Sequence, residues 1–298
     1  NLNNFLPTED LDMPLENVLD KWIISRLNES IKNVTQLVEK YQADKAVEDI
    51  ENFVINDLSN WYVRRSRERV ALYAEEEDKK ACLITLWFVL TEYSKLLASF
   101  IPFISEEIYT NLTGEESVHL ADWPEHNEEL IDEELNSSMF TIRGYVERVH
   151  AIRKENNIKV RQPLGRIGLF GYPDQERKWF EKLEKLLRDE LNVKDVEYLM
   201  YASIPKGKNI IDVTENEDYK KKRGMFVDIE LTAGLREEGE TRDIIRQIQG
   251  ERKKLGTRLS EKVDVTLPKW PKEFESEIKK RALVSNLIKG QSFRVKRA

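Results

Sequence analysis

The chain has 298 residues, of which 40% are apolar and 35% charged, and its formal net charge is -7. This composition describes a globular protein with many charged helices and excludes a disordered chain or an integral membrane protein. No apolar run approaches the roughly 20 residues that a bilayer requires, and the N-terminus lacks the pattern of a signal peptide, so we expect a cytoplasmic protein. The length allows two or three domains.

The sequence contains no catalytic or metal-binding pattern. Cys82 is the single cysteine and lies among apolar residues at helical spacing, which favours a packed thiol over a reactive one. His119, His126 and His150 lack cysteine partners and ligand spacing, so we expect no metal site. A glycine-rich phosphate loop, paired histidines and a serine elbow are also missing, which argues against a self-contained enzyme.

Apolar residues three or four positions apart predict helices in the first part of the chain. The helices cover residues 19–41, 44–73, 77–99 and 104–112, the last ended by Gly114. The apolar stripe of the first helix includes Val38 and Tyr41. Short connections between the four predict an up-and-down bundle over residues 1–130. A connecting helix follows over residues 131–156.

The pattern changes after residue 156. It predicts strands at residues 165–173, 192–202, 224–231 and 262–268, helices at 174–191, 234–256 and 271–290, and a loop or linker over 203–224. Strand, helix and strand follow one another twice, which indicates two small α+β subdomains, 157–224 and 225–298. The expected fold class is therefore α plus α+β: a helical bundle followed by two small mixed subdomains.

The stretch NDLSNWYVRRSRERV, residues 56–70, concentrates cations in an acidic chain. Steps of four, four and three residues place Asn56, Asn60, Arg64 and Arg67 on one helix face. Arginine can donate two hydrogen bonds to a phosphate, and aromatic rings stack on unpaired bases. We therefore expect RNA contacts from Asn60, Trp61, Tyr62, Arg64, Arg65, Arg67 and Arg69. The alternative is a solvated face neutralised by Glu68 and other acids, with Trp61 in the core.

Two further segments are basic. Residues 143–166 contain seven Lys or Arg against Glu147 and Glu155, and we expect RNA contacts from Arg143, Arg153, Lys154, Lys159, Arg161 and Gln162. Arg252, Lys253 and Lys254, followed by Arg258, end a later helix; they are candidates for RNA contact, although cations at a helix C-terminus are favourable by themselves. Net acidity does not exclude RNA binding, because exposed charges are screened beyond roughly 8 Å.

Several motifs resemble, in chain order, the region of the isoleucyl-tRNA synthetases that follows the catalytic domain. They are DLSNWYVRRSRERV, KLLASFIPFISEEIYTNL, SVHLADWP and NNIKVRQPLGR. ELNVKDVEYL and LREEGETRDIIRQIQGERKKLG resemble the further C-terminal part of the archaeal and eukaryotic-like branch. The valyl- and leucyl-tRNA synthetases share the bundle, whereas residues 60–65 and 160–164 point to the isoleucine family.

This resemblance covers nearly the whole chain and implies a region that binds the anticodon stem-loop of isoleucine tRNA. The ATP-site signatures and the editing domain of the family do not occur in this sequence. We therefore expect ATP and Mg²⁺ to bind a catalytic domain elsewhere in the same chain, and this region alone to be inactive. We expect no cofactor, DNA or membrane partner here. The alternatives are the equivalent region of a valyl- or leucyl-tRNA synthetase, and a non-enzymatic helical interaction scaffold.

Overall fold

A computed structural model describes residues 16–71, 74–200, 205–214, 223–258 and 260–298. The chain divides into two compact units, Asn1–Phe140 and Thr141–Ala298. The first unit is helical and the second combines helices with two small sheets, so the expected α plus α+β class is confirmed. Within the described residues, every helix is too short or too polar to cross a membrane.

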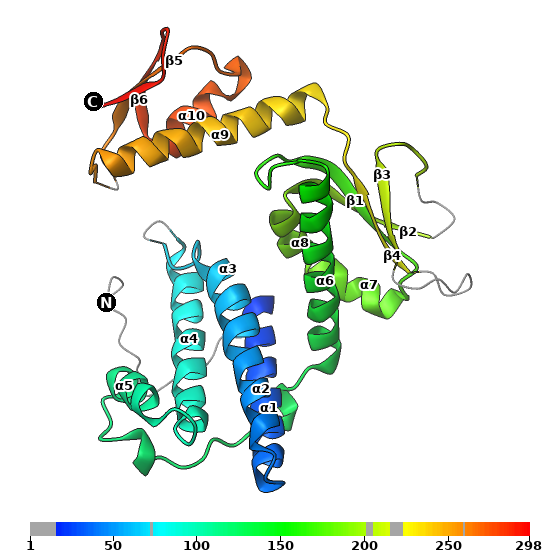
Figure 1. Ribbon diagram of the computed structural model, residues 1–298, viewed down its shortest axis with the longest axis vertical. Helices are drawn as coiled ribbons and strands as arrows, with labels where there is room; N and C mark the ends of the chain where they lie inside the picture. Colours follow the sequence, from blue (N-terminus) through cyan, green and yellow to red (C-terminus); the bar gives the residue numbers. More distant parts are fainter. Residues whose placement is uncertain (1–15, 72–73, 201–204, 215–222, 259) are drawn as a thin grey trace. The chain divides into compact units, whose positions relative to one another are not determined.

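The first unit is built around α1 (Val18–Glu39), which contacts α2 (Ala43–Glu51) and α4 (Glu76–Leu97) (Figure 1). Trp22, Ile23, Leu27, Ile31 and Val34 form the buried stripe of α1. α5 (Pro102–Thr113) packs on α4, and two short 3₁₀ turns follow, η2 (Val118–Leu120) and η3 (Glu128–Leu130). The amphipathic spacing of the sequence is thus realised as helices packed on one another.

α2 continues without interruption into η1 (Asn52–Val63), a π-helical segment, and then α3 (Arg64–Ser66). The buried residues of η1 are Phe53, Asp57, Leu58, Trp61 and Tyr62. They recur every four to five positions, which is wider than the α-helical period of 3.6 and suits i→i+5 hydrogen bonding. Phe53 stacks on Tyr93 of α4 with ring centroids 4.4 Å apart, which fixes this register.

The ends of α5 and α1 can be compared with the helix ends predicted from the sequence. Pro102 occupies the first turn of α5, and Gly114 ends it with φ of 77°, as expected for a left-handed cap. The placement of Val38 and Tyr41 on the buried stripe of α1 is wrong, since Val38 is 39% exposed. α1 ends at Glu39, Tyr41 adopts φ of 59°, and its side chain is 96% exposed because the chain has already turned towards α2.

α6 (Glu133–Glu155) begins in the first unit and ends in the second. The second unit then forms β1 (Leu164–Phe170), α7 (Asp174–Lys182), α8 (Glu184–Leu191), β2 (Val193–Leu199), β3 (Ile210–Thr214) and β4 (Gly224–Asp228). The sheet order is β2-β1-β4-β3, with β1 and β2 parallel and the other pairs antiparallel.

Two predictions for this region need correction. The helix predicted over 174–191 is divided into α7 and α8 at Leu183. The loop predicted over 203–224 contains β3, which pairs with β4 and so gains a hydrogen-bonding partner that local sequence does not reveal. Residues 203–204 and 215–222 of that loop lie outside the described residues.

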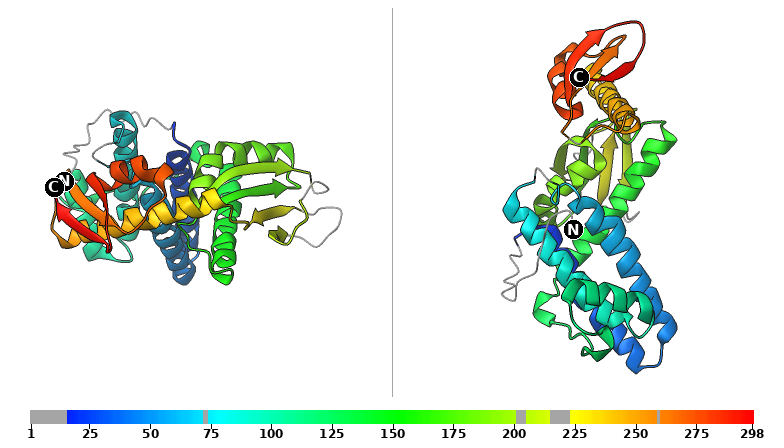
Figure 2. Two further views of the ribbon diagram at one scale, coloured as in Figure 1. Left: turned by 90° about the horizontal axis from the view of Figure 1, so that it is seen from above. Right: turned by 90° about the vertical axis from the view of Figure 1, so that its left-hand side faces the viewer.

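The rest of the second unit is α9 (Ala233–Lys254), β5 (Val263–Leu267), η5 (Lys272–Phe274), α10 (Glu275–Ala282), β6 (Val284–Lys289) and β7 (Arg294–Arg297). The sheet order is β6-β5-β7, and it packs with α10 against the later turns of α9 (Figures 1 and 2). The helix predicted over 271–290 is wrong in its second half. Leu283 ends α10 with φ of 53°, and Val284 then pairs with Val263.

Candidate nucleic-acid interface

One face of the continuous helix from α2 to α3 is polar and open to solvent. Asn56, Asn60, Arg64 and Arg67 are all exposed, whereas Phe53 and Leu58 are buried. The four residues predicted to share a face are therefore all open to solvent, while Val54 of the predicted apolar side is half-buried. Whether Asn60, Arg64 and Arg67 contact RNA stays a prediction.

Arg69 belongs to an ion cluster that joins three parts of the first unit. Its Nη1 and Nη2 donate to the two carboxylate oxygens of Asp20 on α1, each at 2.7 Å. Its Nε and Nη2 also donate to Asp78 on α4 at 2.7–3.0 Å. Asp20 is fully buried, so its charge requires this cation as a partner. Arg69 therefore acts in the fold, and its expected display to RNA is wrong.

Tyr62 completes the same cluster. Its hydroxyl donates to Asp20 at 2.5 Å, and its side chain is fully buried. Burial, followed by the negative charge of Asp20, raises the pKa of Tyr62 far above its ordinary value, so the hydroxyl stays a donor. The expected stacking of Tyr62 on an RNA base is therefore wrong for the folded protein, because the ring has no exposed surface.

Trp61 is also a core residue, as the alternative interpretation of the sequence held. It is 7% exposed, and the Arg65 guanidinium carbon lies 3.8 Å from its ring centroid. This is a cation–π contact within one turn of the helix. The burial of Trp61 and its contact with Arg65 remove the ring as a stacking platform, and Arg65 is half-buried.

Arg153, near the end of α6, is 1% exposed. Its guanidinium donates to four backbone carbonyls, at 2.6–3.2 Å, of Lys159, Gln162, Leu191 and Asn192. Burial, together with the charge of Arg242, lowers the pKa of Arg153 to about 10, so it remains a cation at neutral pH. Arg153 fixes the loop after α6 against the end of α8, and its expected display to RNA is wrong.

The exposed cations of that loop share one acid of α9. Lys159 Nζ lies 2.5 Å from Asp243 Oδ2, and Arg161 Nε lies 2.9 Å from Asp243 Oδ1. Burial opposes ionisation of Asp243, but the hydrogen bonds from both cations outweigh it and lower the pKa of Asp243. Lys159 and Arg161 keep solvent-exposed surface, yet their charges are partly neutralised by this internal carboxylate.

Gln162 attaches the same loop to the start of α9. Its side-chain amide donates to the carbonyl oxygens of Leu235, on the first turn, and Pro163. A Cβ on Gly239 would lie 2.0 Å from the amide oxygen of Gln162, so a larger residue there would displace the end of the Gln162 side chain. Gln162 is thus a packing residue between the loop and the helix.

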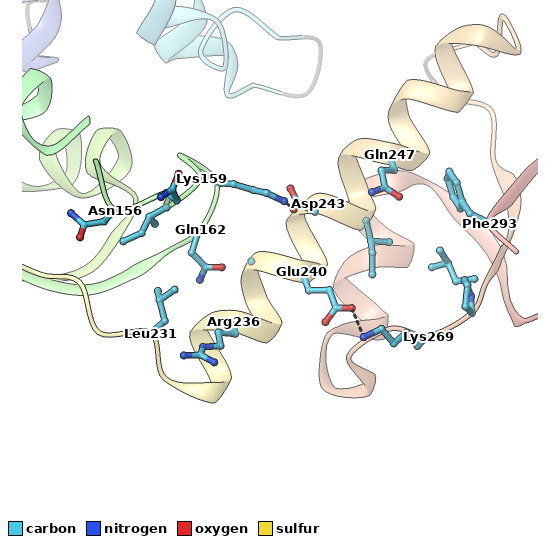
Figure 3. A pocket seen from close by; sticks show the side chains of 16 residues that line it. Asn156, Lys159, Gln162, Leu231, Arg236, Glu240, Asp243, Gln247, Lys269 and Phe293 are labelled. Carbon is cyan, nitrogen blue, oxygen red and sulfur yellow. Dashed lines mark hydrogen bonds and ion pairs between the residues drawn. The ribbon is translucent and has the colours of Figure 1, made fainter. Parts of the chain in front are cut away.

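A pocket of about 690 Å³ opens beside this junction (Figure 3). The loop after α6 contributes Asn156, Lys159 and Gln162, and the facing side of α9 contributes Arg236, Glu240, Asp243 and Gln247. Lys269 closes another side and lies 3.6 Å from Glu240. The lining also includes the apolar residues Ile158, Leu231, Ile244, Leu267 and Phe293, so the pocket combines charged groups of both signs and amides with apolar surface.

The three candidates for RNA contact at the end of α9 differ in their exposure to solvent. Arg252 is buried, and its guanidinium donates to the carbonyls of Arg258 and Glu261 at 3.2 and 2.5 Å. Its display to RNA was therefore wrongly expected. Lys253 and Lys254 are exposed, and Lys254 pairs with Glu251 at 2.7 Å. Both stay candidates for RNA contact.

Of the remaining candidates, Lys154 is exposed at the end of α6 and Arg143 is half-buried. Arg166 is held on the sheet by Glu197 and Asp228 at 3.0 and 3.2 Å. In the described part of the chain, His, Cys, Asp and Glu form no group of three or more that could hold a metal ion. Cys82 is fully buried, which confirms the packed thiol, and burial raises its pKa.

Sequence reasoning found the cations but missed the acids that hold them. Asp20 lies 49 residues before Arg69, and Asp243 lies 82 residues after Arg161. Asp20 carried a weak signal, because it stands beside the apolar residues Leu19 and Trp22 of a predicted helix. Asp243 carried a similar one, since it precedes Ile244 and Ile245 on α9.

Comparison of the sequence with known protein families identifies the type of domain that carries these residues. Residues 20–167 match the model of the anticodon-binding domain of tRNA ligases. The matched region extends from α1 to β1 and includes the solvent-facing side of η1 and α3 with Asn60, Arg64 and Arg67. This part of the chain is therefore an anticodon-binding domain of the tRNA-ligase type.

The relatives define the particular family. The chain is 34% identical to an isoleucine–tRNA ligase of Pyrococcus furiosus over 89% of its length, and 32% identical to that of Clostridium acetobutylicum over 96%. It spans about a third of these curated relatives, 30% and 34% of their lengths. The chain belongs to the isoleucine–tRNA ligase family and corresponds to its anticodon-binding region.

Proposed function

We propose that this chain binds the anticodon stem-loop of isoleucine tRNA and positions it for a ligase whose catalytic domain lies in another part of the same polypeptide. In that complete enzyme, which acts in the cytoplasm, ATP and Mg²⁺ belong to the catalytic domain. This region forms no ester by itself, and its contribution is to select and orient the RNA.

The observation that carries the proposal is the coincidence of the family match with an open cationic face. The matched region contains Asn60, Arg64 and Arg67, which project from one side of a helix whose other side is core. Guanidinium groups donate charge-assisted hydrogen bonds to phosphate oxygens, and an amide can bond to base edges or ribose. The second unit has exposed cations of its own, among them Lys154, Lys253 and Lys254.

Binding of labelled tRNA to the 298-residue chain tests the proposal. Isoleucine tRNA should bind more tightly than the same tRNA with an altered anticodon, and more tightly than valine or leucine tRNA. Protection of the bound tRNA from nuclease should be concentrated in the anticodon stem and loop. Arg67→Ala should weaken binding and reduce the slope of log Kd against log salt by about 1, because one phosphate contact is lost.

Three results would contradict the proposal. Equal and weak binding of all four RNAs would favour a protein-interaction scaffold. Preference for valine or leucine tRNA would assign the region to a different amino acid specificity. Isoleucine-dependent pyrophosphate exchange by this chain alone would show that it carries its own catalytic site.

A further inference from the structure

The second unit contains the same structural module twice. In the first module, α6 leads through a loop to β1, a helical crossover of α7 and α8, and the parallel strand β2. In the second module, α9 leads through a loop to β5, the crossover helix α10, and the parallel strand β6. Each module adds a third strand antiparallel to its first, β4 to β1 and β7 to β5 (Figure 1).

The two loops repeat each other residue by residue. Arg252 follows Arg153 by 99 positions (252 − 153), and both are buried arginines near a helix end. Each donates to the carbonyls six and nine residues later: Lys159 and Gln162 in the first module, Arg258 and Glu261 in the second. The carbonyl of each arginine accepts from the amide five residues later, at 2.8 and 3.2 Å.

The repetition extends into the strands. Asn157 and Gly256, four residues after the two arginines, both have positive φ, 54° and 64°. β1 begins at Leu164 and β5 at Val263, again 99 positions apart (263 − 164). The first amide of each strand donates at 3.0 Å to a residue that ends the crossover helix with φ near 50°, Asn192 or Leu283. The loop and the strands that follow it therefore have the same backbone arrangement in both modules.

The copies differ in what their exposed cations bind. In the first module, Lys159 and Arg161 hold the Asp243 carboxylate, which marks a position over this loop where an oxyanion is stabilised. Arg258 is the counterpart of Lys159 and is exposed, but Ser260 replaces Arg161. Among the residues that the structure describes, the Arg258 guanidinium has no acidic partner, and the same holds for Lys253 and Lys262.

The charge around the second loop is strongly positive although the chain carries -7. Residues 252–262 contain five Lys or Arg and one acid, and residues 289–297 contain four Lys or Arg and no acid. Arg297, at the end of β7, donates to the carbonyls of Leu255 and Gly256 at 3.0 and 3.4 Å and so attaches the edge strand to the loop. The two basic segments therefore meet within one small module, where Arg297 contacts the loop directly.

We infer that the described residues of this loop, 252–258 and 260–262, form a second RNA-docking surface, at which Arg258 binds a backbone phosphate in the position that the Asp243 carboxylate occupies over the first loop. Lys253 and Lys262 flank the same loop and supply further charge to the ribose-phosphate chain. In the first loop this position is occupied by Asp243 of α9, whereas in the second loop the equivalent position is open to an RNA phosphate. This inference rests on the proposed function and adds a site to it.

The test compares two variants of the 298-residue chain that remove the same charge. The first combines Lys253→Ala, Arg258→Ala and Lys262→Ala. The control combines Lys178→Ala, Lys185→Ala and Lys280→Ala, three exposed lysines of the second unit outside the loop. Binding of labelled isoleucine tRNA is measured between about 50 and 200 mM salt, where each phosphate contact contributes about 1 to the slope of log Kd against log salt.

The loop variant should lose at least tenfold in affinity, and its salt slope should fall by about 1 to 3, while the control changes both by much less. Arg258→Lys should retain more binding than Arg258→Ala, because a point cation still pairs with phosphate. Failure of the unaltered chain to bind tRNA would overturn the proposed function and this inference together. Normal tRNA binding with equal losses in the two triple variants would overturn this inference alone. Matching circular dichroism spectra and urea midpoints of the variants ensure that folding is not the cause of either outcome.

Discussion

Arg69 and Arg67 stand two residues apart in the basic stretch, yet the structure gives them different roles. Replacing Arg69 by alanine removes five hydrogen bonds between its guanidinium and the carboxylates of Asp20 and Asp78. Asp78 keeps 38% of its side chain exposed and can be hydrated after the loss. Asp20 is fully buried and cannot, so it would remain as a charge without its cation.

The cost follows from that buried carboxylate. Removing one partner of a buried ion pair lowers the free energy of unfolding by about 3–5 kcal/mol, because the other charge stays desolvated. Arg69→Ala should therefore destabilise the first unit by that amount. Arg67→Ala changes an exposed side chain and should stay within about 0.5 kcal/mol. The matched pair isolates burial, since both variants remove one arginine from neighbouring positions.

Urea unfolding followed by circular dichroism measures the difference. A double variant sharpens it: Asp20→Asn removes the buried charge while keeping an acceptor for the Tyr62 hydroxyl. Adding it to Arg69→Leu should restore about 1–3 kcal/mol relative to Arg69→Leu alone, because the two residues are directly coupled. tRNA binding at low urea should follow the opposite order, with Arg67→Ala weakened and any folded Arg69 variant less affected.

One result would refute this reasoning. If Arg69→Ala unfolds within about 1 kcal/mol of the unaltered chain while losing tRNA affinity, then the arginine serves the RNA and the internal cluster contributes little.

Three further predictions follow from single contacts. Gly250→Ala has open space in α9 and should stabilise the chain by up to about 1 kcal/mol through helix propensity. Gly239→Ala must also displace the end of the Gln162 side chain and its hydrogen bond to Leu235, so it should be less stable than Gly250→Ala by about 1 kcal/mol. Equal urea midpoints of the two variants would contradict the close packing. The folded state lowers the pKa of Asp243, so the stabilising contribution of its carboxylate is complete above the unfolded-state pKa of about 3.9 and is lost as pH falls through the folded-state pKa. Below about pH 4 the unaltered chain should therefore lose stability more steeply than Asp243→Asn. Parallel pH profiles of stability for the two proteins would contradict this prediction. Because burial raises the pKa of Cys82, a thiol reagent should modify it only as fast as the fold opens, and rapid reaction in native buffer would contradict its packing.

The spacing of apolar and polar residues predicted helix faces correctly where one face of a helix is buried and the other is exposed to solvent. The stripe of α1, the left-handed end of α5 at Gly114 and the solvent-facing row of Asn56, Asn60, Arg64 and Arg67 all followed from spacing. β3, β6 and β7 did not, because a short strand is stabilised by the neighbour that accepts and donates its backbone hydrogen bonds. Residues 284–289 directly follow the helix α10, but they form the strand β6 because they pair with β5.

The sequence by itself determined the helical first part, the first strand, helix and strand of the second part, and where positive charge is concentrated. The second predicted unit was wrong, because its strands β4 and β5 belong to different sheets and the second copy is β5, α10 and β6. Only the tertiary structure decided which cations face solvent. Helical period fixes a side chain's direction relative to its own helix, but an ion pair also requires an acid from another element within about 4 Å. Asp20 and Asp243 meet Arg69 and Arg161 across 49 and 82 residues of chain. The same residue type therefore supports the fold at one position and stays open to a partner at another, such as Arg67 or Arg258.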